Sequence, residues 1–350
     1  MKPHYPILDG LRGTAAILVV IFHLFEAYYP NSFITPIHHG YLAVDFFFML
    51  SGFVIGYAYD GRWGSMTTWA FFKIRLIRLH PLVVLSAVIG AIVFWFNPFK
   101  SATSHVDLLK LIGVMLITST LLPTPDVHGS GEAYSLNGPL WSLFEEYIAN
   151  ILYAFIGRRM STRVLTIFVI ICAVVLTRGI IERGTASTGW AYYNFHSGVV
   201  RVMFPFFAGY LIFRAGKKIR IPFGYVVCSL VLIILLMLPY FKYNGVYEVV
   251  TIIFIFPVII AIGAGSPIDG NWAKVCKFSG DISYPIYILH YPFIYIFTDW
   301  IAVKKPSAHS MLLVGSCALL FFVLMAYTVL KLYDEPVRAW LKRRLITAKT

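Results

Sequence analysis

Residues 41–59, YLAVDFFFMLSGFVIGYAY, form an apolar run in which Asp45 is the only charged side chain. A membrane-spanning helix needs roughly 20 predominantly apolar residues, and this run has about that length. Similar runs recur on both sides of it, near 13–29, 77–96, 108–122, 140–157, 164–181, 199–213, 222–240, 246–264, 284–301 and 311–331. The pattern predicts an all-α, polytopic transmembrane helix bundle.

The composition agrees with this fold class. The 350 residues are 59% hydrophobic and 13% charged, whereas soluble domains are about 45–50% apolar and about 25% charged. A soluble enzyme, a disordered chain and a secreted disulfide scaffold are therefore excluded. The four cysteines are scattered without a C-x-x-C pair, so we expect neither disulfides nor a metal site. The net charge of +13 lies in short loops between apolar runs, which favours membrane topology over nucleic-acid binding as its cause.

The distribution of basic residues predicts which runs cross the membrane. If the run near 108–122 does not cross, 21 of the 29 Lys and Arg residues fall on the cytoplasmic side, as the positive-inside rule requires. We therefore expect about ten spans with both termini cytoplasmic, and an outer segment 97–139 that includes a re-entrant or interfacial helix near 108–122. The first helix is expected to stay in the mature protein, because Arg12 and His23 interrupt it and no signal-peptide cleavage site follows.

Ionisable groups inside apolar runs are costly in a bilayer and are therefore functional candidates. Arg12 and His23 are the first such pair along the chain. Their separation corresponds to about 16.5 Å of helix rise and a net rotation of about 20°, which places them on one face of the first helix. Singly, each is explained as a snorkelling anchor or a satisfied core histidine. Together they predict a water-accessible shaft with cations at its inner entrance and an imidazole at its end.

His23, Asp45 and Glu145 are expected at one depth in the membrane, since each lies about four to six residues from the outer end of its run. A carboxylate beside an imidazole fixes its tautomer, which a general base requires. We predict His23, Asp45 and Glu145 as the catalytic group. The alternative is a structural histidine–carboxylate bridge between helices, because such networks also form without chemistry.

Arg75 and Arg78 are neighbours on one helical face and could bind a phosphorylated ligand, although anchoring to anionic lipid headgroups explains their spacing as well. Four-residue spacing puts Asn137, Trp141 and Glu145 on one stripe, with Glu146 facing elsewhere.

The run from Ser283 to His290 predicts a helix start with Pro285 near its first turn and His290 deeper in the membrane. Both a site role and a hydrogen bond to a neighbouring helix explain His290. Ser51, with Gly52 and Gly56, is expected to ease close helix packing.

In their order along the chain, these motifs resemble the acyltransferase 3 family of integral-membrane O-acyltransferases. The matching segments are Leu8-Asp9-Gly10-Leu11-Arg12-Gly13 followed by His23, residues 40–53, Arg75-Leu76-Ile77-Arg78, Trp141-Ser142-Leu143 with Glu145, Tyr284-Pro285 with His290, and Glu335-Pro336. The resemblance covers nearly the whole chain. It implies transfer of an acyl group, most often acetyl, from cytoplasmic acyl-CoA to a hydroxyl of an envelope polysaccharide, a lipid-linked glycan or a related carbohydrate acceptor.

With this resemblance, residues 1–350 are expected to form a single transmembrane acyltransferase domain, with 332–350 as a basic cytoplasmic tail, in a bacterial inner membrane. Arg12, Arg75 and Arg78 would bind the phosphates of CoA, and no metal would be needed. His23 would deprotonate the acceptor hydroxyl, Asp45 or Glu145 would orient it, and the supporting or oxyanion-stabilising residues would be drawn from a further set. That set is Asn137, Trp141, Tyr284 and His290. An acyl-histidine intermediate is a variant of this mechanism.

A second class of function, a proton-coupled transporter or flippase of a glycan or lipid-linked sugar, would also use buried histidines and carboxylates. It predicts half-helices in matched repeats, and the sequence shows no such symmetry. A purely structural subunit of an envelope assembly would not need Arg12 and His23 on one stripe. The acceptor, the hydroxyl modified and the oligomeric state are not encoded in any motif of the sequence.

Overall fold

A computed structural model describes residues 5–29, 31, 34–100 and 106–346. The regular secondary structure of those residues is helical and includes no strand, only an isolated bridge between Glu132 and Ala191. The all-α bundle predicted from the apolar runs is therefore confirmed. The ends of the predicted domain and tail, 1–4 and 347–350, and part of the outer segment, 101–105, lie outside the described residues.

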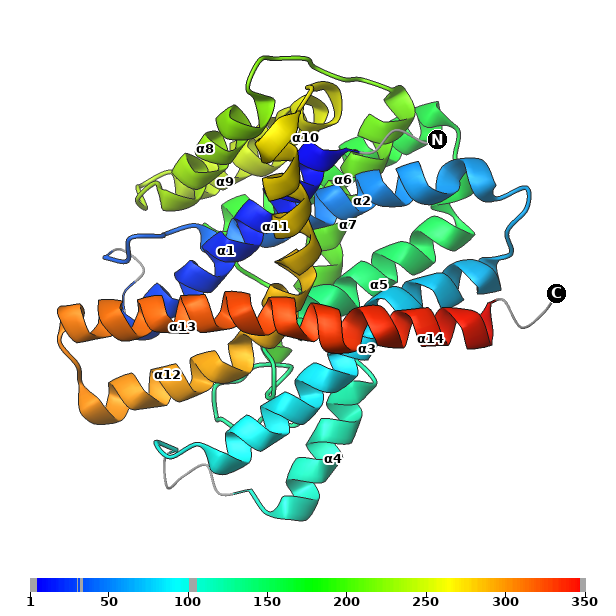
Figure 1. Cartoon of the computed structure of the whole chain (residues 1–350). Helices are drawn as coiled ribbons and strands as arrows, with labels where there is room; N and C mark the ends of the chain where they lie inside the picture. Colours follow the sequence, from blue (N-terminus) through cyan, green and yellow to red (C-terminus); the bar gives the residue numbers. More distant parts are fainter. Residues whose placement is uncertain (1–4, 30, 32–33, 101–105, 347–350) are drawn as a thin grey trace.

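Most of the α-helices follow one another with short connections, and a longer one, residues 120–139, joins α4 to α5 (Figure 1). Their bounds are α1 Pro6–Tyr28, α2 Ala43–Tyr59, α3 Thr68–Phe96, α4 Leu108–Ser119, α5 Leu140–Phe155, α6 Thr162–Arg183, α7 Phe195–Ala215, α8 Gly224–Met237, α9 Asn244–Val250, α10 Phe256–Gly265, α11 Gly270–Leu289, α12 Tyr291–Lys304, α13 Ala308–Val329 and α14 Glu335–Leu345. Hydroxyl or carboxylate caps begin α3, α4, α6 and α13, where the side chain accepts a hydrogen bond from a backbone N–H three residues on. One-turn π-helices join α9 to α10 (η5, Thr251–Ile255) and α13 to α14 (η6, Leu330–Asp334).

Two helix pairs form the centre of the bundle: α1 packs along α11, and α2 packs along α7. The second pair is in backbone contact. A Cβ at Gly52 would overlap the carbonyl oxygen of Phe206, and a Cβ at Gly209 would overlap that of Met49. The expected role of Gly52 in close helix packing is thus confirmed.

Long helices around this centre enclose it on two sides. α13 and α14 are joined through η6 into one rod that crosses the front of the molecule in Figure 1, coloured orange to red. α3 and α4 lie side by side in the lower part of the view in Figure 1. The predicted tail 332–350 is thus helical over most of its described length. The predicted re-entrant or interfacial segment is the 12-residue helix α4, which buries Leu111, Val114 and Thr118.

Seven helices are long and apolar enough to cross a membrane, and the bent pair α11–α12 raises the number to eight, within the described residues. This is fewer than the predicted count of about ten. Two of the predicted spans, 140–157 and 222–240, correspond to α5 and α8, which have 16 and 14 residues. Helices of that length are shorter than a typical span.

The predicted helix start at Ser283 is wrong. Residues Gly270–Leu289 form α11, and Pro285 lies inside this helix. α11 then breaks at His290, and α12 continues at an angle of 55°. The polar first half of α11, with Lys274 and Lys277, lacks an apolar run but is helical because it packs along α1.

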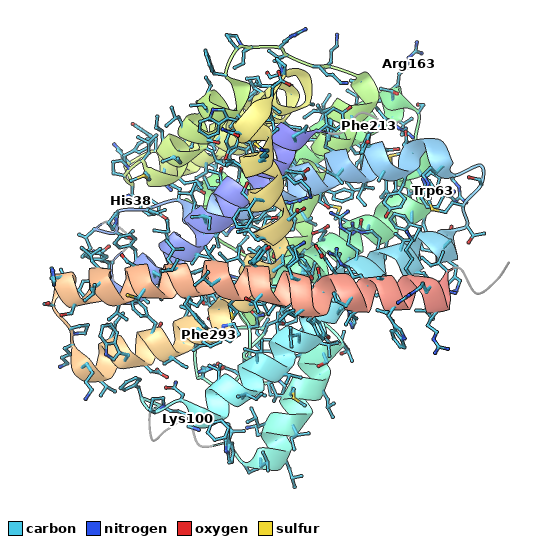
Figure 2. All side chains as sticks on the ribbon, in the orientation of Figure 1. His38, Trp63, Lys100, Arg163, Phe213 and Phe293 are labelled. Atoms are coloured by element: carbon cyan, nitrogen blue, oxygen red, sulfur yellow. The ribbon has the colours of Figure 1, made fainter. Side chains whose placement is uncertain are left out.

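The side chains at the helix ends agree with a common direction across the membrane. Figure 2 shows His38 and Lys100 towards the left of the molecule, and Trp63 and Arg163 towards the right. The predicted topology assigns the first two to the outer side and the last two to the cytoplasmic side. α1 begins and α14 ends on the same right-hand side of Figure 1. That this side is cytoplasmic stays a prediction.

Candidate active site

Two cavities lie between the central helices. The first, of about 230 Å³, is lined by arginines from α1, α3 and α14, and we call it the arginine cavity. The second, of about 360 Å³, is lined by His23 together with side chains from the loop before α5 and from α12, and we call it the histidine cavity. Both cavities touch Val44 and Tyr287. Two adjoining cavities therefore take the place of the single predicted shaft.

Helix α1 contributes one side chain to each cavity. Arg12 lines the arginine cavity, and His23 lines the histidine cavity. Both face α11 and the break that follows it, since Arg12 donates to Ser283 Oγ (2.9 Å) and His23 stacks on His290 with ring centroids 5.5 Å apart. The prediction that Arg12 and His23 share one face of the first helix is confirmed.

Small residues bring α1 this close to α11. A Cβ at Gly280 would lie 2.6 Å from the Cβ of Asp9, and a Cβ at Gly13 would overlap Ser279. The close approach lets Arg12 Nη2 reach the carbonyl oxygen of Gly280 at 3.1 Å, beside its ion pair with Asp9 at 3.1 Å. Arg12 is thereby held in one orientation at the wall of the arginine cavity.

The two arginines of α3 have different surroundings. Arg75 is buried and donates to Glu146 Oε1 at 2.6 Å, and Ser51 Oγ donates to the same oxygen at 2.6 Å. Glu146 thus faces a partner helix, as predicted. Arg78 also lines the cavity but has no hydrogen bond or ion pair with any described residue. Of the predicted pair, Arg78 is the guanidinium free to bind an anion.

Most other charges on the wall of the arginine cavity have an ion-pair partner. Arg338, which the sequence analysis missed, pairs with Asp334 at 2.8 Å. Asp281 pairs with Lys277, and Glu335 pairs with Lys331. The four-residue spacing within each of these pairs is the signal that marks them in the sequence. Against this background, Arg78 is the arginine of the wall that forms no direct hydrogen bond or ion pair with the described residues.

His23 contacts a carboxylate that the sequence analysis did not consider. Its Nδ1 lies 3.0 Å from Oε2 of Glu26, one helical turn further along α1. An ionised carboxylate can only accept a hydrogen bond, so in the neutral imidazole this contact places the proton on Nδ1 and leaves the lone pair on Nε2. Among the described residues, Nε2 has no hydrogen-bond partner. The imidazole is therefore set in the tautomer of a general base, with its edge packed by Tyr291 at 4.8 Å between ring centroids.

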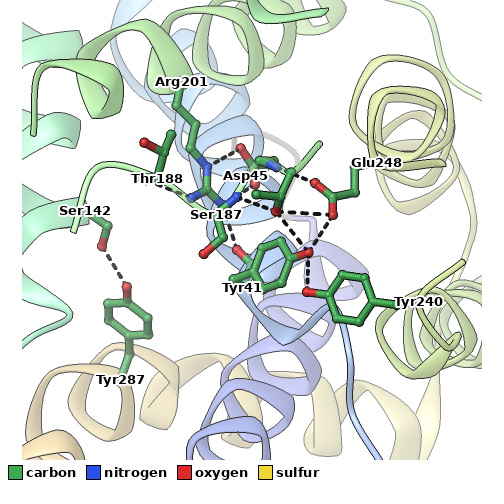
Figure 3. A network of polar contacts seen from close by, with 11 residues as sticks. Tyr41, Asp45, Ser142, Ser187, Thr188, Arg201, Tyr240, Glu248 and Tyr287 are labelled. Atoms are coloured by element: carbon green, nitrogen blue, oxygen red, sulfur yellow. Dashed lines mark hydrogen bonds and ion pairs between the residues drawn. The ribbon is translucent and has the colours of Figure 1, made fainter. Parts of the chain in front are cut away.

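Asp45, one of the two predicted partners of His23, is instead paired with Arg201. Two hydrogen bonds of 3.0 and 2.6 Å join the carboxylate to the guanidinium, and both side chains are almost completely buried. Arg201 also donates to the backbone carbonyls of Tyr41 and Thr188 (Figure 3). Arg201 completes this arrangement by lying over the ring of Trp141, 5.4 Å from its centroid, at the wall of the histidine cavity.

The Asp45–Arg201 pair continues into a wider network. Tyr41 donates to Glu248 at 2.5 Å and accepts from Tyr240 at 2.7 Å, as the dashed lines of Figure 3 show. These contacts tie α2, α7, α9 and the loops beside them together. The geometry assigns Asp45 to this network and not to His23.

Glu145, the other predicted partner, is fully buried, and neither of its oxygens has a hydrogen-bond partner among the residues that the structure describes. It lies beside Gly198 of α7, where a Cβ would come 2.7 Å from Oε1. An isolated carboxylate cannot stay ionised in such surroundings. Glu145 lines neither cavity, so the structure does not bring it to His23.

The four predicted supporting residues surround the site in different ways. Trp141 lines the histidine cavity. Asn137 donates to the carbonyl of Ile288 at 2.7 Å, at the end of α11. Tyr284 lines the arginine cavity and donates to the carbonyl of Leu79 at 2.6 Å.

His290 is buried at the break between α11 and α12, where its Nδ1 contacts the carbonyls of Ile286 and Tyr287, each at 2.9 Å. Asn137, Tyr284 and His290 thus hold the backbone around the cavities, and Trp141 is the one of the four that reaches the histidine cavity.

Glu132, in the loop between α4 and α5, is a further carboxyl group at the histidine cavity. Tyr291 donates to its Oε1 at 3.1 Å, and Tyr295 donates to its Oε2. Burial raises the pKa of Glu132 to about 7, although both tyrosine hydrogen bonds act in the opposite direction. A glutamate in a polar loop carries no periodic signal, which is why the sequence analysis missed it.

We expect Glu132→Gln to stabilise the protein increasingly as the pH rises. The unfolded chain releases this proton near the ordinary value of 4.5, whereas the folded protein holds it up to about pH 7. The wild type therefore loses stability as the pH rises between these two values. At 1.36 kcal/mol for each pKa unit the loss is about 3 kcal/mol, and the glutamine variant, which has no proton to release, does not suffer it. The measurement is the melting temperature of both proteins in detergent from about pH 4.5 to about pH 8. Parallel curves would show that Glu132 does not hold this proton.

Comparisons with known proteins agree with the resemblance seen in the motifs. The sequence model of a family described as "Acyltransferase domain" matches residues 5–331. "Protein 2 in picA locus" of Rhizobium radiobacter is 36% identical over 179 residues, which cover 49% of this chain and 91% of that protein. Acyltransferase MdmB of Streptomyces mycarofaciens is 31% identical over 150 residues, which cover 41% of this chain and 36% of that protein. No solved structure matches the chain.

Proposed function

We propose a function for this chain on the premise that it belongs to the acyltransferase 3 family. It moves an acetyl group from cytoplasmic acyl-CoA to a hydroxyl of an envelope or exported carbohydrate. The family match and the long apolar helices make it a membrane-bound acyltransferase. The donor, the acceptor and the roles of individual residues are the proposal. The observation that carries them is that α1 places Arg12 and His23 at two cavities that adjoin each other.

The arginine cavity suits an anionic donor. Arg78 offers a guanidinium that forms no direct ion pair within the described part of the chain, and Arg12 lies on the same wall. Guanidinium groups match phosphate oxygens in two-pronged hydrogen bonds, so the phosphates of acyl-CoA are suitable ligands for them. The cavity lies between the first half of α1, α3 and the part of the α13–α14 rod formed by η6 and the start of α14, on the side predicted to be cytoplasmic. A donor from the cytosol would enter there without crossing the membrane.

The histidine cavity suits a carbohydrate acceptor. Trp141, Trp190 and Tyr291 offer aromatic surfaces, and Glu26 and Glu132 offer carboxyl oxygens to hydroxyl donors. A mostly apolar lining with a few polar groups that fix orientation is the usual composition of a small-molecule site.

The reaction needs one base, and His23 supplies it. Nε2 takes the proton of the acceptor hydroxyl while the oxygen attacks the carbonyl carbon of the thioester. The C–S bond then breaks, and the thiolate leaves as free CoA thiol when it recovers the proton from Nε2. Glu26 holds the imidazole in the required tautomer throughout. The products are an ester on the acceptor and CoA, with no net change in protons.

The test uses purified protein in detergent with acetyl-CoA and measures free CoA thiol with and without candidate glycans. Thiol release that depends on the protein and rises with the acceptor is expected. Mass spectrometry of glycans from cells with and without the protein should show a mass difference of one acyl group. If folded protein releases no thiol from any acyl-CoA and the glycans are unchanged, the proposal is wrong.

The proposal includes a location in the bacterial cytoplasmic membrane with both termini on the cytoplasmic side. The positive-inside distribution of Lys and Arg supports it. A reporter that is active only outside the cytoplasm, fused after Leu345, should be silent. An active reporter at that position would invert the orientation and place the arginine cavity on the outer side.

A further inference from the structure

The two cavities are separated by very little protein. Val44 and Tyr287 are the residues that line both of them. Val44 is a small side chain in the first turn of α2, whereas Tyr287 is a large one in the last turn of α11. An acyl group that leaves a donor in the arginine cavity and joins an acceptor in the histidine cavity must pass this point.

Tyr287 is held in position by one hydrogen bond at its tip. Its hydroxyl lies 2.7 Å from Oγ of Ser142 in α5, and Figure 3 shows the two groups pointing at each other, apart from the Arg201 network. Ser142 Oγ in turn donates to the carbonyl of Pro139 at 2.9 Å. Because the serine proton is used there, the tyrosine hydroxyl donates to Ser142.

The rest of the ring is packed by aromatic groups and borders the two cavities. Phe47 meets it edge-on with centroids 5.4 Å apart, and His290 lies 6.3 Å away. The backbone at Tyr287 is close to the end of α11, where its carbonyl contacts Nδ1 of His290 and the chain bends by 55°. A side chain at a helix end, fixed by one hydrogen bond and bordered by open space on two sides, can turn without unfolding its helix.

We propose that Tyr287 is the gate between the donor and acceptor cavities, and that its size restricts the reaction to short acyl groups. The proposal rests on the proposed function and adds a specificity-determining residue to it. When the hydrogen bond to Ser142 is made, the ring fills the junction. When the bond is broken, the ring turns and the thioester carbonyl comes within reach of the histidine cavity.

The test compares acetyl-CoA with butyryl-CoA in the thiol-release and transfer assays. Tyr287→Ala removes the ring and should shift the ratio of kcat/KM towards butyryl-CoA by about tenfold or more, since each methylene that a pocket accepts or rejects changes specificity by about 10- to 200-fold. Tyr287→Phe keeps the ring and loses the hydrogen bond. It should therefore keep the acetyl preference of the wild type but release more thiol in the absence of acceptor. Ser142→Ala removes the same hydrogen bond from the other side and should behave like Tyr287→Phe.

Tyr284→Ala is the matched control. Tyr284 lies about one turn earlier on α11 and lines only the arginine cavity, so its loss should change donor KM without changing the acyl preference. Elution as a single species and an unchanged melting temperature establish that each variant is folded. If Tyr287→Ala does not fold, Tyr287→Leu, which is smaller than tyrosine but keeps apolar packing, takes its place.

The outcomes separate the two proposals. If the wild type transfers acetyl groups but folded Tyr287→Ala or Tyr287→Leu keeps the wild-type ratio of acetyl to butyryl transfer, the gate is refuted and the proposed function stands. The gate is also refuted if Tyr284→Ala shifts this ratio as much as Tyr287→Ala does. If the wild type releases no thiol from any acyl-CoA, the proposed function fails and the gate fails with it.

Discussion

Replacing His23 by alanine should lower acyl transfer by about 10²- to 10⁴-fold, which is the usual contribution of a positioned general base. His23 lines the histidine cavity, and the hydrogen bond from its Nδ1 to Glu26 leaves Nε2 of the neutral imidazole as the nitrogen that can accept a proton. The side chain already borders a cavity, so its loss should leave the helix packing and the melting temperature nearly unchanged. The measurement is the rate of acyl transfer to the acceptor by folded protein, with acetyl-CoA in excess.

The control for His23→Ala is Glu26→Ala. Glu26 is mostly exposed, and water can replace the hydrogen bond that it accepts from His23. We therefore expect a smaller loss of activity, because the imidazole is still present but less well oriented. If His23→Ala keeps activity within about tenfold of the wild type, His23 is not the base. If Glu26→Ala is as inactive as His23→Ala, the carboxylate has a larger part in the chemistry than orientation.

The second large effect is on folding. Asp45→Ala should destabilise the protein by about 3–5 kcal/mol, because it leaves the guanidinium of Arg201 buried without its counter-charge. The carbonyls of Tyr41 and Thr188 still accept hydrogen bonds from Arg201 but carry no charge. The expected result is a much lower yield of protein that elutes as a single species, together with a large fall in melting temperature.

The double variant Asp45→Leu with Arg201→Met distinguishes a buried charge from lost packing. Removal of both charges should restore much of the yield that either single change abolishes, because no unpaired ion is then left inside the bundle. Glu182→Ala, which breaks the exposed ion pair with Arg178, is the surface control and should have no measurable effect. If Asp45→Ala is as stable as Glu182→Ala, the network of Figure 3 does not hold the helices together.

The sequence predicts well those features of the structure that depend on the geometry of a single helix. The apolar runs predict the fold class, and the spacing of Arg12 and His23 predicts that they share a face, because both properties follow from the helical repeat alone. Glu26 could have been found in the same way, since it lies three residues after His23. The expected count of about ten spans exceeds the number of described helices that are long enough to span, because an apolar run does not show where its helix ends, as α5 and α8 illustrate.

Properties that depend on how two helices are rotated against each other were not predictable in this way. Asp45 was expected near His23 on the basis of depth alone, but the rotation of α2 directs it to Arg201 of α7. The position of Glu132 depends on how the loop before α5 folds over the cavity. The polar start of α11 was missed because its helicity comes from contact with α1 and not from hydropathy.

The backbone contact between α2 and α7 has a mechanical consequence. Gly52 and Gly209 each lie against the backbone of the other helix. At these points the two helices therefore have no layer of side chains between them that could compress or slide. They are expected to move as one rigid beam. A bulky glycan could then enter only if the opposite wall of the cavity moves. That wall contains the 55° bend between α11 and α12, so we expect the movement there while α2 and α7 stay in place.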